Sequence, residues 1–114
     1  MKYKVLITDD SRMNRELLTD ILGDRYEYLY AENGVQLIEM LSSGVEVDII
    51  LLDINMPRMD GFEVLEIMNE RSWIEEIPVV VVSAEIDLEF LDRAYKLGAN
   101  DYISRPFLTP AVQH

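Results

Sequence analysis

The sequence predicts an α/β fold, a three-layer α/β/α sandwich built around a parallel sheet. Short apolar runs alternate with longer stretches whose apolar residues recur at helical spacing, and this unit repeats four times before a fifth apolar run. Such alternation is typical of parallel strands joined by right-handed crossover helices. A length of 114 residues suits one domain with one core, so we expect residues 1–114 to form a single domain.

The stretch 48–61 provides the clearest strand. Ile49 to Leu52 run without a polar break, as expected for a strand buried on both faces of a parallel sheet. The run ends on Asp53, and a buried strand should not stop at a charge unless the charge reaches open space or a counterion. Pro57 cannot donate to a ladder. Asp53 is therefore predicted at the carboxyl end of a central strand, where open α/β sheets bind ligands.

The elements before this strand follow the same pattern. Residues 4–8 form the first apolar run, and a helix with Asp10 or Ser11 as its cap and Gly23 at its end follows. Arg12 and Arg15 fall on the polar side of that helix. Residues 27–31 are predicted as the second strand, and a second helix from about 35 to 42 follows the turn or cap at 33–34.

The elements after residue 60 complete the alternation. Asp60 is a good N-cap for a third helix, residues 79–82 form a buried strand, a fourth helix is closed by Gly98, and residues 102–103 form a short fifth strand. Thr109-Pro110 is a helix-start signal with four residues after it. We therefore expect a truncated fifth helix in a domain excised from a longer protein, and association, as in a homodimer, through the face that this helix would cover.

Composition excludes several classes of function. Asp and Glu number 22 against 10 Lys and Arg, a formal charge of −12, which argues against direct binding of nucleic acid. No apolar stretch is long enough to span a membrane, and no signal-peptide pattern opens the chain. With 0 cysteines there is no disulfide framework and no thiolate metal site. A cytoplasmic location fits this composition.

Acidic residues end two strands: Asp9 and Asp10 the first, Asp53 the third. Carboxylates brought together at one sheet edge repel, and either take up protons or bind a cation. Because the candidate ligands are all oxygens, Mg²⁺ is the expected ion. Ser83 and Arg105 end the fourth and fifth strands, adding a hydroxyl and a positive charge. This combination is typical of a phosphoryl-transfer site, although Asp9-Asp10 alone also fits a helix cap.

The chain resembles the receiver domain of two-component response regulators along nearly its whole length. Each motif is weakly diagnostic alone, but their order is specific. The matching segments are Asp9-Asp10, Asp53-Ile54-Asn55-Met56-Pro57, Met59-Asp60-Gly61, Ser83-Ala84, residues 98–103, and Arg105-Pro106-Phe107.

The resemblance implies a flavodoxin-like sheet of five parallel strands in the order 2-1-3-4-5. It implies that Asp53 accepts a phosphoryl group from a histidine kinase or a histidine phosphotransfer domain. Asp9, Asp10, Asp53 and the backbone carbonyl of Asn55 would bind Mg²⁺. Ser83 would bond the phosphoryl group, and Tyr102 would be the switch aromatic, although Tyr102 alone also fits a core position. The domain would not be an enzyme in its own right, and an output domain, which can be an enzyme, often follows.

One residue departs from the family pattern, since Arg105 stands where the family has lysine. Arginine keeps the charge but is planar and bulkier, so a degenerate receiver that acts as a constitutive interaction module is the alternative function. A haloacid-dehalogenase-like phosphohydrolase is a more distant alternative, because its nucleophile usually ends the first strand in an Asp-x-Asp pattern. Here the acids of the first strand are adjacent.

Overall fold

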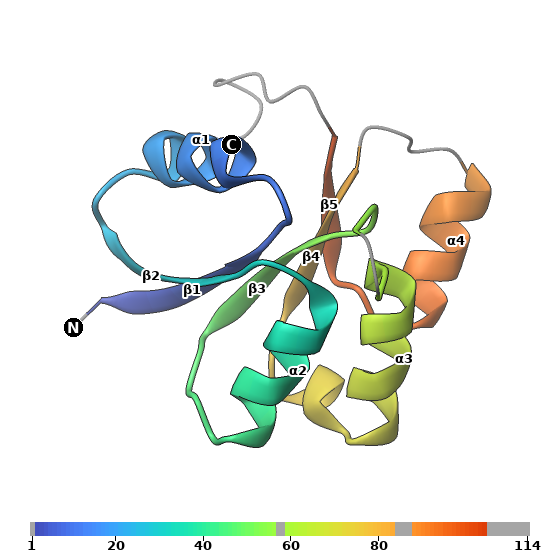
Figure 1. Cartoon of the computed structure of the whole chain (residues 1–114). Helices are drawn as coiled ribbons and strands as arrows, with labels where there is room; N and C mark the ends of the chain where they lie inside the picture. Colours follow the sequence, from blue (N-terminus) through green and yellow to red (C-terminus); the bar gives the residue numbers. More distant parts are fainter. Residues whose placement is uncertain (1, 57–58, 84–87, 105–114) are drawn as a thin grey trace.

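A computed structural model describes residues 2–56, 59–83 and 88–104 of the chain. Its centre is a 5-stranded parallel sheet with the strand order β2-β1-β3-β4-β5, as Figure 1 shows. This confirms the predicted fold class and strand order. The strands are β1 (Tyr3–Thr8), β2 (Tyr26–Ala31), β3 (Ile49–Asp53), β4 (Val79–Ser83) and β5 (Asp101–Ser104).

Strand β3 is the interior strand that the apolar run predicted. It pairs with β1 on one side and β4 on the other, and Ile50, Leu51 and Leu52 are buried although successive side chains point to opposite faces. Burial on both faces requires helices on both sides of the sheet. Because the strand includes Asp53, the carboxylate is held at a fixed position on the sheet edge.

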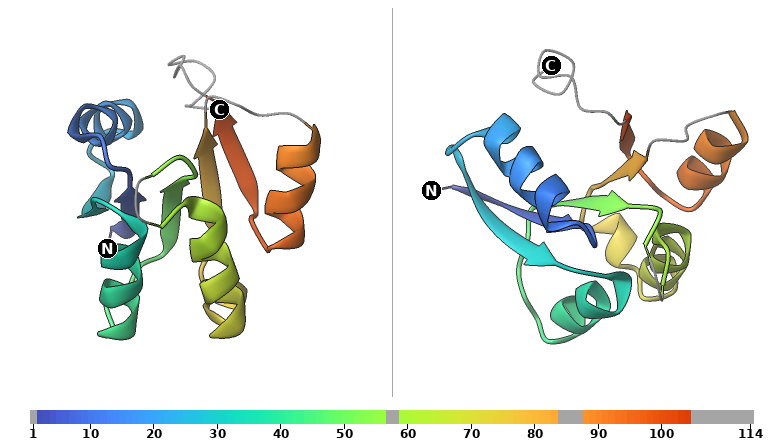
Figure 2. Two further views of the ribbon diagram at one scale, coloured as in Figure 1. Left: turned by 45° about the vertical axis from the view of Figure 1, so that its right-hand side comes forward. Right: turned by 45° about the horizontal axis from the view of Figure 1, so that its top comes forward.

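The helices cover both faces of the sheet unequally. Helix α1 packs on one face, and α2, α3 and α4 pack on the other, which the views in Figures 1 and 2 both show. This is the three-layer arrangement that the alternation predicted. The helices are α1 (Arg12–Leu22), α2 (Gly34–Ser42), α3 (Gly61–Glu70) and α4 (Leu88–Lys96).

Side-chain caps fix where three helices begin. Ser11, Asn33 and Asp60 each accept a hydrogen bond from a backbone N–H in the first turn of α1, α2 and α3. Such caps satisfy donors that would otherwise lack an intrahelical partner. Of the two caps considered for α1, Ser11 is the one used. Gly23 ends the helix, as predicted, with a φ of 85° that favours glycine.

The core divides into a larger and a smaller cluster on the two faces of the sheet. The larger cluster, under α2, α3 and α4, includes Leu6, Leu52 and Val81, whereas the smaller one, under α1, includes Ile7, Leu51 and Val82. Neighbouring residues of each strand therefore go to opposite clusters, and the apolar run of β3 serves both.

A short 3₁₀ turn, Trp73–Glu75, precedes β4 and was not predicted. It is too short to show a hydrophobic period, and it follows Ser72, which has a left-handed φ of 62°. The guanidinium of Arg71 lies 5.0 Å from the centre of the Trp73 ring. This cation–π contact holds the indole over the end of α3.

The predicted fifth helix, beginning at Thr109-Pro110, lies outside the described residues. Its expected face is the α1 side of the sheet beside β5, where Val80 and Ile103 are only partly buried. None of the helices in the described ranges combines the length and apolar character that a membrane span requires.

Candidate functional site

Three carboxylates from two strands meet at the carboxyl edge of the sheet. Asp9 and Asp10 follow β1, Asp53 ends β3, and one oxygen from each lies within 4.8 Å of the other two. The two strands are direct neighbours in the sheet, which brings their ends together. Asp9 and Asp53 are 1% exposed, whereas Asp10 is exposed. The predicted acid cluster is therefore present, with one open side.

The end of β1 is held largely by groups of helix α1. The Asp9 backbone N–H donates to the Ala31 carbonyl at 3.1 Å, which continues the pairing with β2. The Ser11 backbone N–H donates to Asp9 Oδ1 at 2.9 Å. Arg15 Nη1 donates to the Asp9 carbonyl oxygen at 2.6 Å. Asp9 is thus fixed through its amide, its carboxylate and its carbonyl.

The end of β3 is held by backbone groups. The Ile54 N–H donates to the Val82 carbonyl at 3.1 Å, and the Gly61 N–H donates to the Ile54 carbonyl at 2.9 Å. The Asn55 backbone N–H donates to Asp53 Oδ1 at 3.1 Å. A Cβ on Gly61 would lie 2.8 Å from both the Asp53 carbonyl oxygen and Ile54 Cα. Glycine is needed here because α3 begins in contact with the strand that carries Asp53.

Ser83 lies at the same edge, at the end of β4. Its side chain is fully buried, and the amide nitrogen of Asn55 lies 3.4 Å from Ser83 Oγ as a donor. The sequence had pointed only to the main-chain carbonyl of Asn55. In addition, the side-chain amide of Asn55 links the loop after β3 to β4, a contact across 28 positions of sequence that no local pattern reveals.

Tyr102 lies on β5, on the face of the sheet that Val81 shares. Its side chain is 40% exposed, so it does not lie inward in this structure. Arg105, predicted at the end of the same strand, lies outside the described residues.

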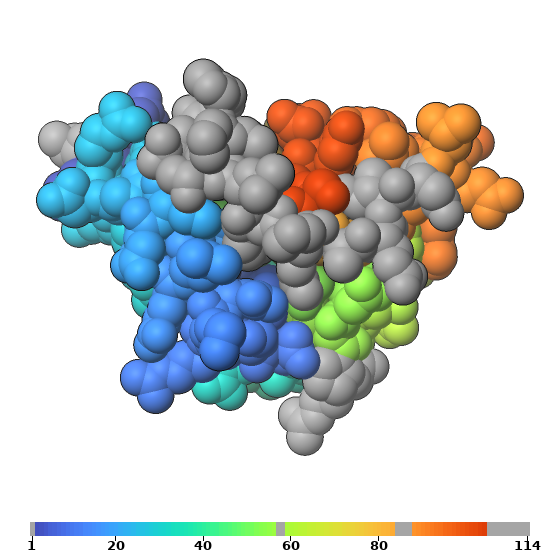
Figure 3. All heavy atoms as spheres, turned by 90° about the horizontal axis from the view of Figure 1, so that it is seen from above, coloured from blue at the N-terminus to red at the C-terminus, as the bar shows by residue number. Residues whose placement is uncertain are grey.

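The space-filling view gives the setting of this edge. Figure 3 shows atoms of the first strand–helix unit, in blue, beside atoms from the start of α3, in green, on one face of the molecule. These are the two segments that carry Asp9 and Asp10 on one side and follow Asp53 on the other.

The donor set fits a hard divalent cation. The three carboxylates supply only oxygen ligands, and one of them is open to solvent. Mg²⁺ prefers oxygen ligands and usually keeps several waters, so a small, one-sided set of carboxylates suits it. A cation would also relieve the repulsion among three acids held within 4.8 Å.

Comparison with known proteins gives the family. The family model for the response regulator receiver domain matches residues 5–113, so the chain belongs to this family. It is a receiver domain of the two-component type, a class of phosphoacceptor signalling domains. The segments that carry the resemblance in the sequence contain the acids that the structure brings together.

Individual relatives agree with this assignment. The chain is 34% identical over 103 residues to the two-component response regulator ORR5 of Oryza sativa subsp. japonica, covering 90% of this chain and 77% of that protein. It is 34% identical over 112 residues to the chemotaxis protein CheY1 of Helicobacter pylori, covering 96% and 89%.

Solved structures share the fold over nearly the whole chain. The chemotaxis protein CheY4 of Vibrio cholerae superposes with a TM-score of 0.88 at 27% identity, covering 99% of this chain and 94% of that one. A putative two-component response regulator/GGDEF domain protein gives a TM-score of 0.86 at 25% identity, covering 98% of this chain and 46% of that one.

Proposed function

We propose that this domain is a phosphorylation-dependent switch and that Asp53 is its phosphoacceptor. The observation that carries the proposal is the meeting of Asp53 with Asp9 and Asp10 at one sheet edge, with oxygens within 4.8 Å. A carboxylate at the end of a rigid interior strand has a fixed position from which to attack a phosphoryl donor. Asp53 is preferred as nucleophile because it lies on β3, between the strand that carries the other acids and the strand that carries Ser83.

In the proposed reaction, a carboxylate oxygen of Asp53 attacks the phosphorus of a phospho-histidine. The new bond joins phosphorus to the Asp53 oxygen, and the bond from phosphorus to the imidazole nitrogen breaks. The imidazole nitrogen keeps the electron pair and takes up a proton. A histidine kinase or a histidine phosphotransfer domain is the proposed partner, and the domain assists its own phosphorylation and dephosphorylation without acting as an enzyme on another substrate.

Asp9, Asp10, Asp53 and the carbonyl of Asn55 are the proposed ligands of Mg²⁺. Bound there, the ion would offset the repulsion between the carboxylates and the incoming phosphoryl group. The residues themselves support this role, because Asp9 is fixed by Ser11 and Arg15 while exposed Asp10 leaves the cluster open on one side.

Ser83 and Tyr102 are the proposed switch residues. A phosphoryl group on Asp53 would accept a hydrogen bond from the Ser83 hydroxyl, whose oxygen now lies 3.4 Å from the side-chain nitrogen of Asn55. Movement of Ser83 would open space beside β5, and Tyr102, now 40% exposed, has room to change its position. Two discrete arrangements of this kind are what a signalling switch requires.

We propose that the output of the switch lies in a further domain of a longer protein. One structural neighbour is described as a response regulator/GGDEF domain protein, and the present chain spans 46% of it. By analogy, we propose a C-terminal output domain, which can be an enzyme, and a cytoplasmic location for the whole.

The alternative is a degenerate receiver that serves as a constitutive interaction module. Its support is Arg105, which replaces the lysine of the family pattern. The acid cluster argues against it, because a module without phosphoryl chemistry has no need to hold Asp9 and Asp53 buried side by side.

Intact-mass spectrometry with acetyl phosphate and Mg²⁺ separates the two functions. The parent is expected to gain one phosphoryl mass, and Asp53→Ala to gain none. Asp20→Ala, which removes an exposed acid from α1, is the matched control and should label as the parent does. Full labelling of Asp53→Ala would overturn the assignment of the nucleophile, and an unlabelled parent would favour the degenerate module.

A further inference from the structure

The Arg15 side chain makes a contact that could not be expected from its charge or from its place on the polar side of α1. Its Nη1 donates to the carbonyl oxygen of Asp9 at 2.6 Å. That oxygen belongs to the peptide unit that joins Asp9 to Asp10, the two acids that β1 contributes to the cluster. A planar peptide whose oxygen is held by a cationic donor cannot rotate freely. The guanidinium therefore fixes the orientation of the link between the two acids.

Asp9 and Asp10 differ in the number of other contacts that fix their positions. Asp9 is also fixed by its amide bond to Ala31 and by the Ser11 N–H on its carboxylate. Asp10 is exposed, and within the described ranges its side chain makes no hydrogen bond or ion pair. The direction in which Asp10 leaves the backbone thus depends strongly on the peptide that Arg15 holds.

We propose that Arg15 is a positioning residue for the divalent-cation site, acting through the Asp9–Asp10 peptide. This inference rests on the proposed function, since it presumes that the acid cluster binds Mg²⁺. Partners that orient metal ligands typically change metal affinity by about 10–100-fold. Because Arg15 acts on a peptide and not on a ligand atom, we expect an effect at or below the lower end of that range.

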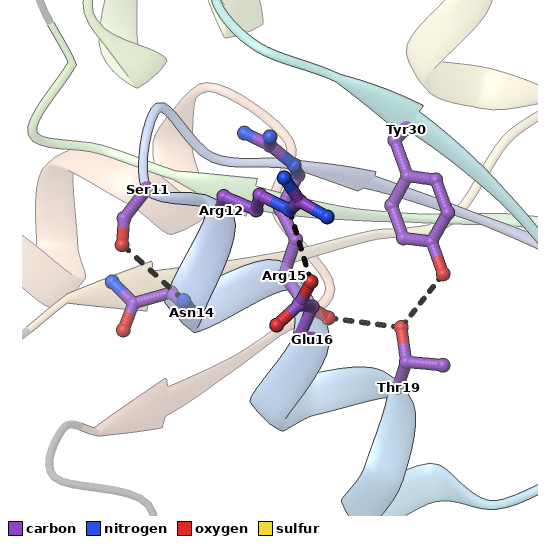
Figure 4. A network of polar contacts seen from close by, with 7 residues as sticks. All are labelled: Ser11, Arg12, Asn14, Arg15, Glu16, Thr19 and Tyr30. Atoms are coloured by element: carbon purple, nitrogen blue, oxygen red, sulfur yellow. Dashed lines mark hydrogen bonds and ion pairs between the residues drawn. The ribbon is translucent and has the colours of Figure 1, made fainter.

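The helix that carries Arg15 is itself fastened to the sheet. The Thr19 hydroxyl donates to the Arg15 carbonyl at 2.9 Å and lies 2.9 Å from the hydroxyl of Tyr30 on β2. Figure 4 shows Thr19 between α1 and the Tyr30 ring, with Arg12 and Arg15 close by. The Thr19 hydroxyl therefore connects the backbone of Arg15 to β2, which holds in place the turn of α1 from which the guanidinium reaches Asp9.

Arg12 offers a matched control on the same helix. It carries the same charge, but its Nε pairs with Glu16 at 3.0 Å on the exposed surface, with side chains that are 85% and 64% exposed. Such exposed pairs contribute little. Both arginines line one open pocket with Glu16, Tyr30, Glu32 and Gln36, so their general electrostatic setting is shared.

The direction in which Mg²⁺ affinity changes when Arg15 is replaced separates a positioning role from a purely electrostatic one. Arg15 is a cation beside an acidic cluster, so removing its charge should by Coulomb repulsion alone strengthen the binding of Mg²⁺. If Arg15 positions Asp10, its removal should instead weaken the binding. The two causes predict opposite changes, and only the positioning role singles out Arg15 over Arg12.

The test is a titration of the folded protein with Mg²⁺ alone, followed by amide chemical shifts, for the parent, Arg15→Met and Arg12→Met. Methionine keeps most of the aliphatic stem and removes the donor. We expect the dissociation constant of Arg15→Met to rise about threefold to tenfold, and that of Arg12→Met to stay within about twofold or to fall. Arg15→Lys, which keeps a cationic donor, should recover part of the loss and serves if Arg15→Met does not fold.

The outcomes separate this inference from the proposed function. If the parent binds Mg²⁺ and Arg15→Met binds it equally well, the positioning role of Arg15 is wrong, while the metal site itself stands. If Arg15→Met does not fold, Arg15→Lys takes its place in this comparison. Equal weakening by Arg12→Met would also overturn the positioning role, since the effect would then be general to the helix. If the parent shows no response to Mg²⁺, the metal site of the proposed function fails, and the role of Arg15 fails with it.

Discussion

The end of β1 and the end of β3 deliver acids to the same place but are held by different groups. At β1, the Arg15 side chain of α1 bonds the Asp9 carbonyl, beside backbone bonds made by the Asp9 and Ser11 N–H groups. At β3, the backbone of Ile54 bonds to Val82 and Gly61, and α3 begins against the strand. A substitution can remove one side-chain contact and leave the others in place. The backbone contacts at β3 require two elements to lie close together, so a larger residue there disturbs all of them. The β3 end should therefore tolerate less change.

Gly61→Ala should give the largest effect, because it attacks the backbone contact at β3. The new Cβ would lie 2.8 Å from the Asp53 carbonyl oxygen and from Ile54 Cα, and backbone atoms cannot yield cheaply. Overpacking of this kind costs about 1–3 kcal/mol, and we expect a loss in the upper part of that range by urea unfolding. Labelling of Asp53 should fall as well.

Gly44→Ala is the control for that variant. No atom lies within 4 Å of a Cβ at Gly44, but its φ is 89°. Its cost should be limited to backbone strain of about 1 kcal/mol, without an effect on labelling. If Gly44→Ala destabilises the protein more than Gly61→Ala does, close packing at the end of β3 is not the dominant constraint.

The two helix caps give a smaller contrast between the same two ends. Asp60 Oδ1 accepts the Glu63 N–H at 2.9 Å, whereas Ser11 Oγ accepts the Asn14 N–H at 3.3 Å. Loss of a cap costs about 0.5–2 kcal/mol, and the charge of Asp60 adds an interaction with the dipole of α3. We expect Asp60→Ala to lower the free energy of unfolding more than Ser11→Ala. The reverse order would contradict the view that the β3 end tolerates less change than the β1 end.

Replacing Thr8, the last residue of β1, should stabilise the protein. Its hydroxyl is buried and has no hydrogen-bond partner within the part of the chain that the structure describes. A buried hydroxyl left unsatisfied costs about 1–3 kcal/mol, so the nearly isosteric Thr8→Val should raise the free energy of unfolding by about 1 kcal/mol. Thr19→Val, which removes a bonded hydroxyl, should lower it. A destabilising Thr8→Val would mean that this hydroxyl has a partner.

Tyr28 gives the smallest effect, at high pH. Partial burial, and next the neighbouring Tyr26 and Tyr30, raise the pKa of the Tyr28 hydroxyl above its usual value near 10. Because the folded state holds this proton more tightly, the contribution is present below about pH 10 and is lost as the pH rises through the folded pKa. Tyr28→Phe should therefore lose less stability than the parent as the pH rises above about 10. An identical alkaline slope would contradict this.

Much of the fold follows from local sequence for identifiable reasons. The run from Ile49 to Leu52 predicted an interior strand because burial on both faces leaves no polar alternation. Asp60 predicted the start of α3 because a cap needs only one side chain and the N–H groups beside it. Both signals lie within a few residues of the structure that they predict.

The candidate site was predicted less completely, because its contacts cross the sequence. The acid cluster was expected, since neighbouring parallel strands must end at one edge. Arg15 was placed on the polar side of its helix, but its side chain turns back toward the N-terminus and reaches Asp9. That direction is usual for long side chains in helices and was the available signal. The Asn55 amide reaches Ser83 across 28 positions, and only a three-dimensional structure brings them together.

If the proposed function holds, the ends of β1 and β3 form one metal site. Titration with Mn²⁺, a paramagnetic substitute for Mg²⁺, tests it directly through broadening of amide signals. We expect the signals of residues 9–11 and 53–55 to broaden together at the same Mn²⁺ concentration, and excess Mg²⁺ to restore both sets. Broadening at one strand end alone, or broadening that Mg²⁺ does not reverse, would contradict a shared site.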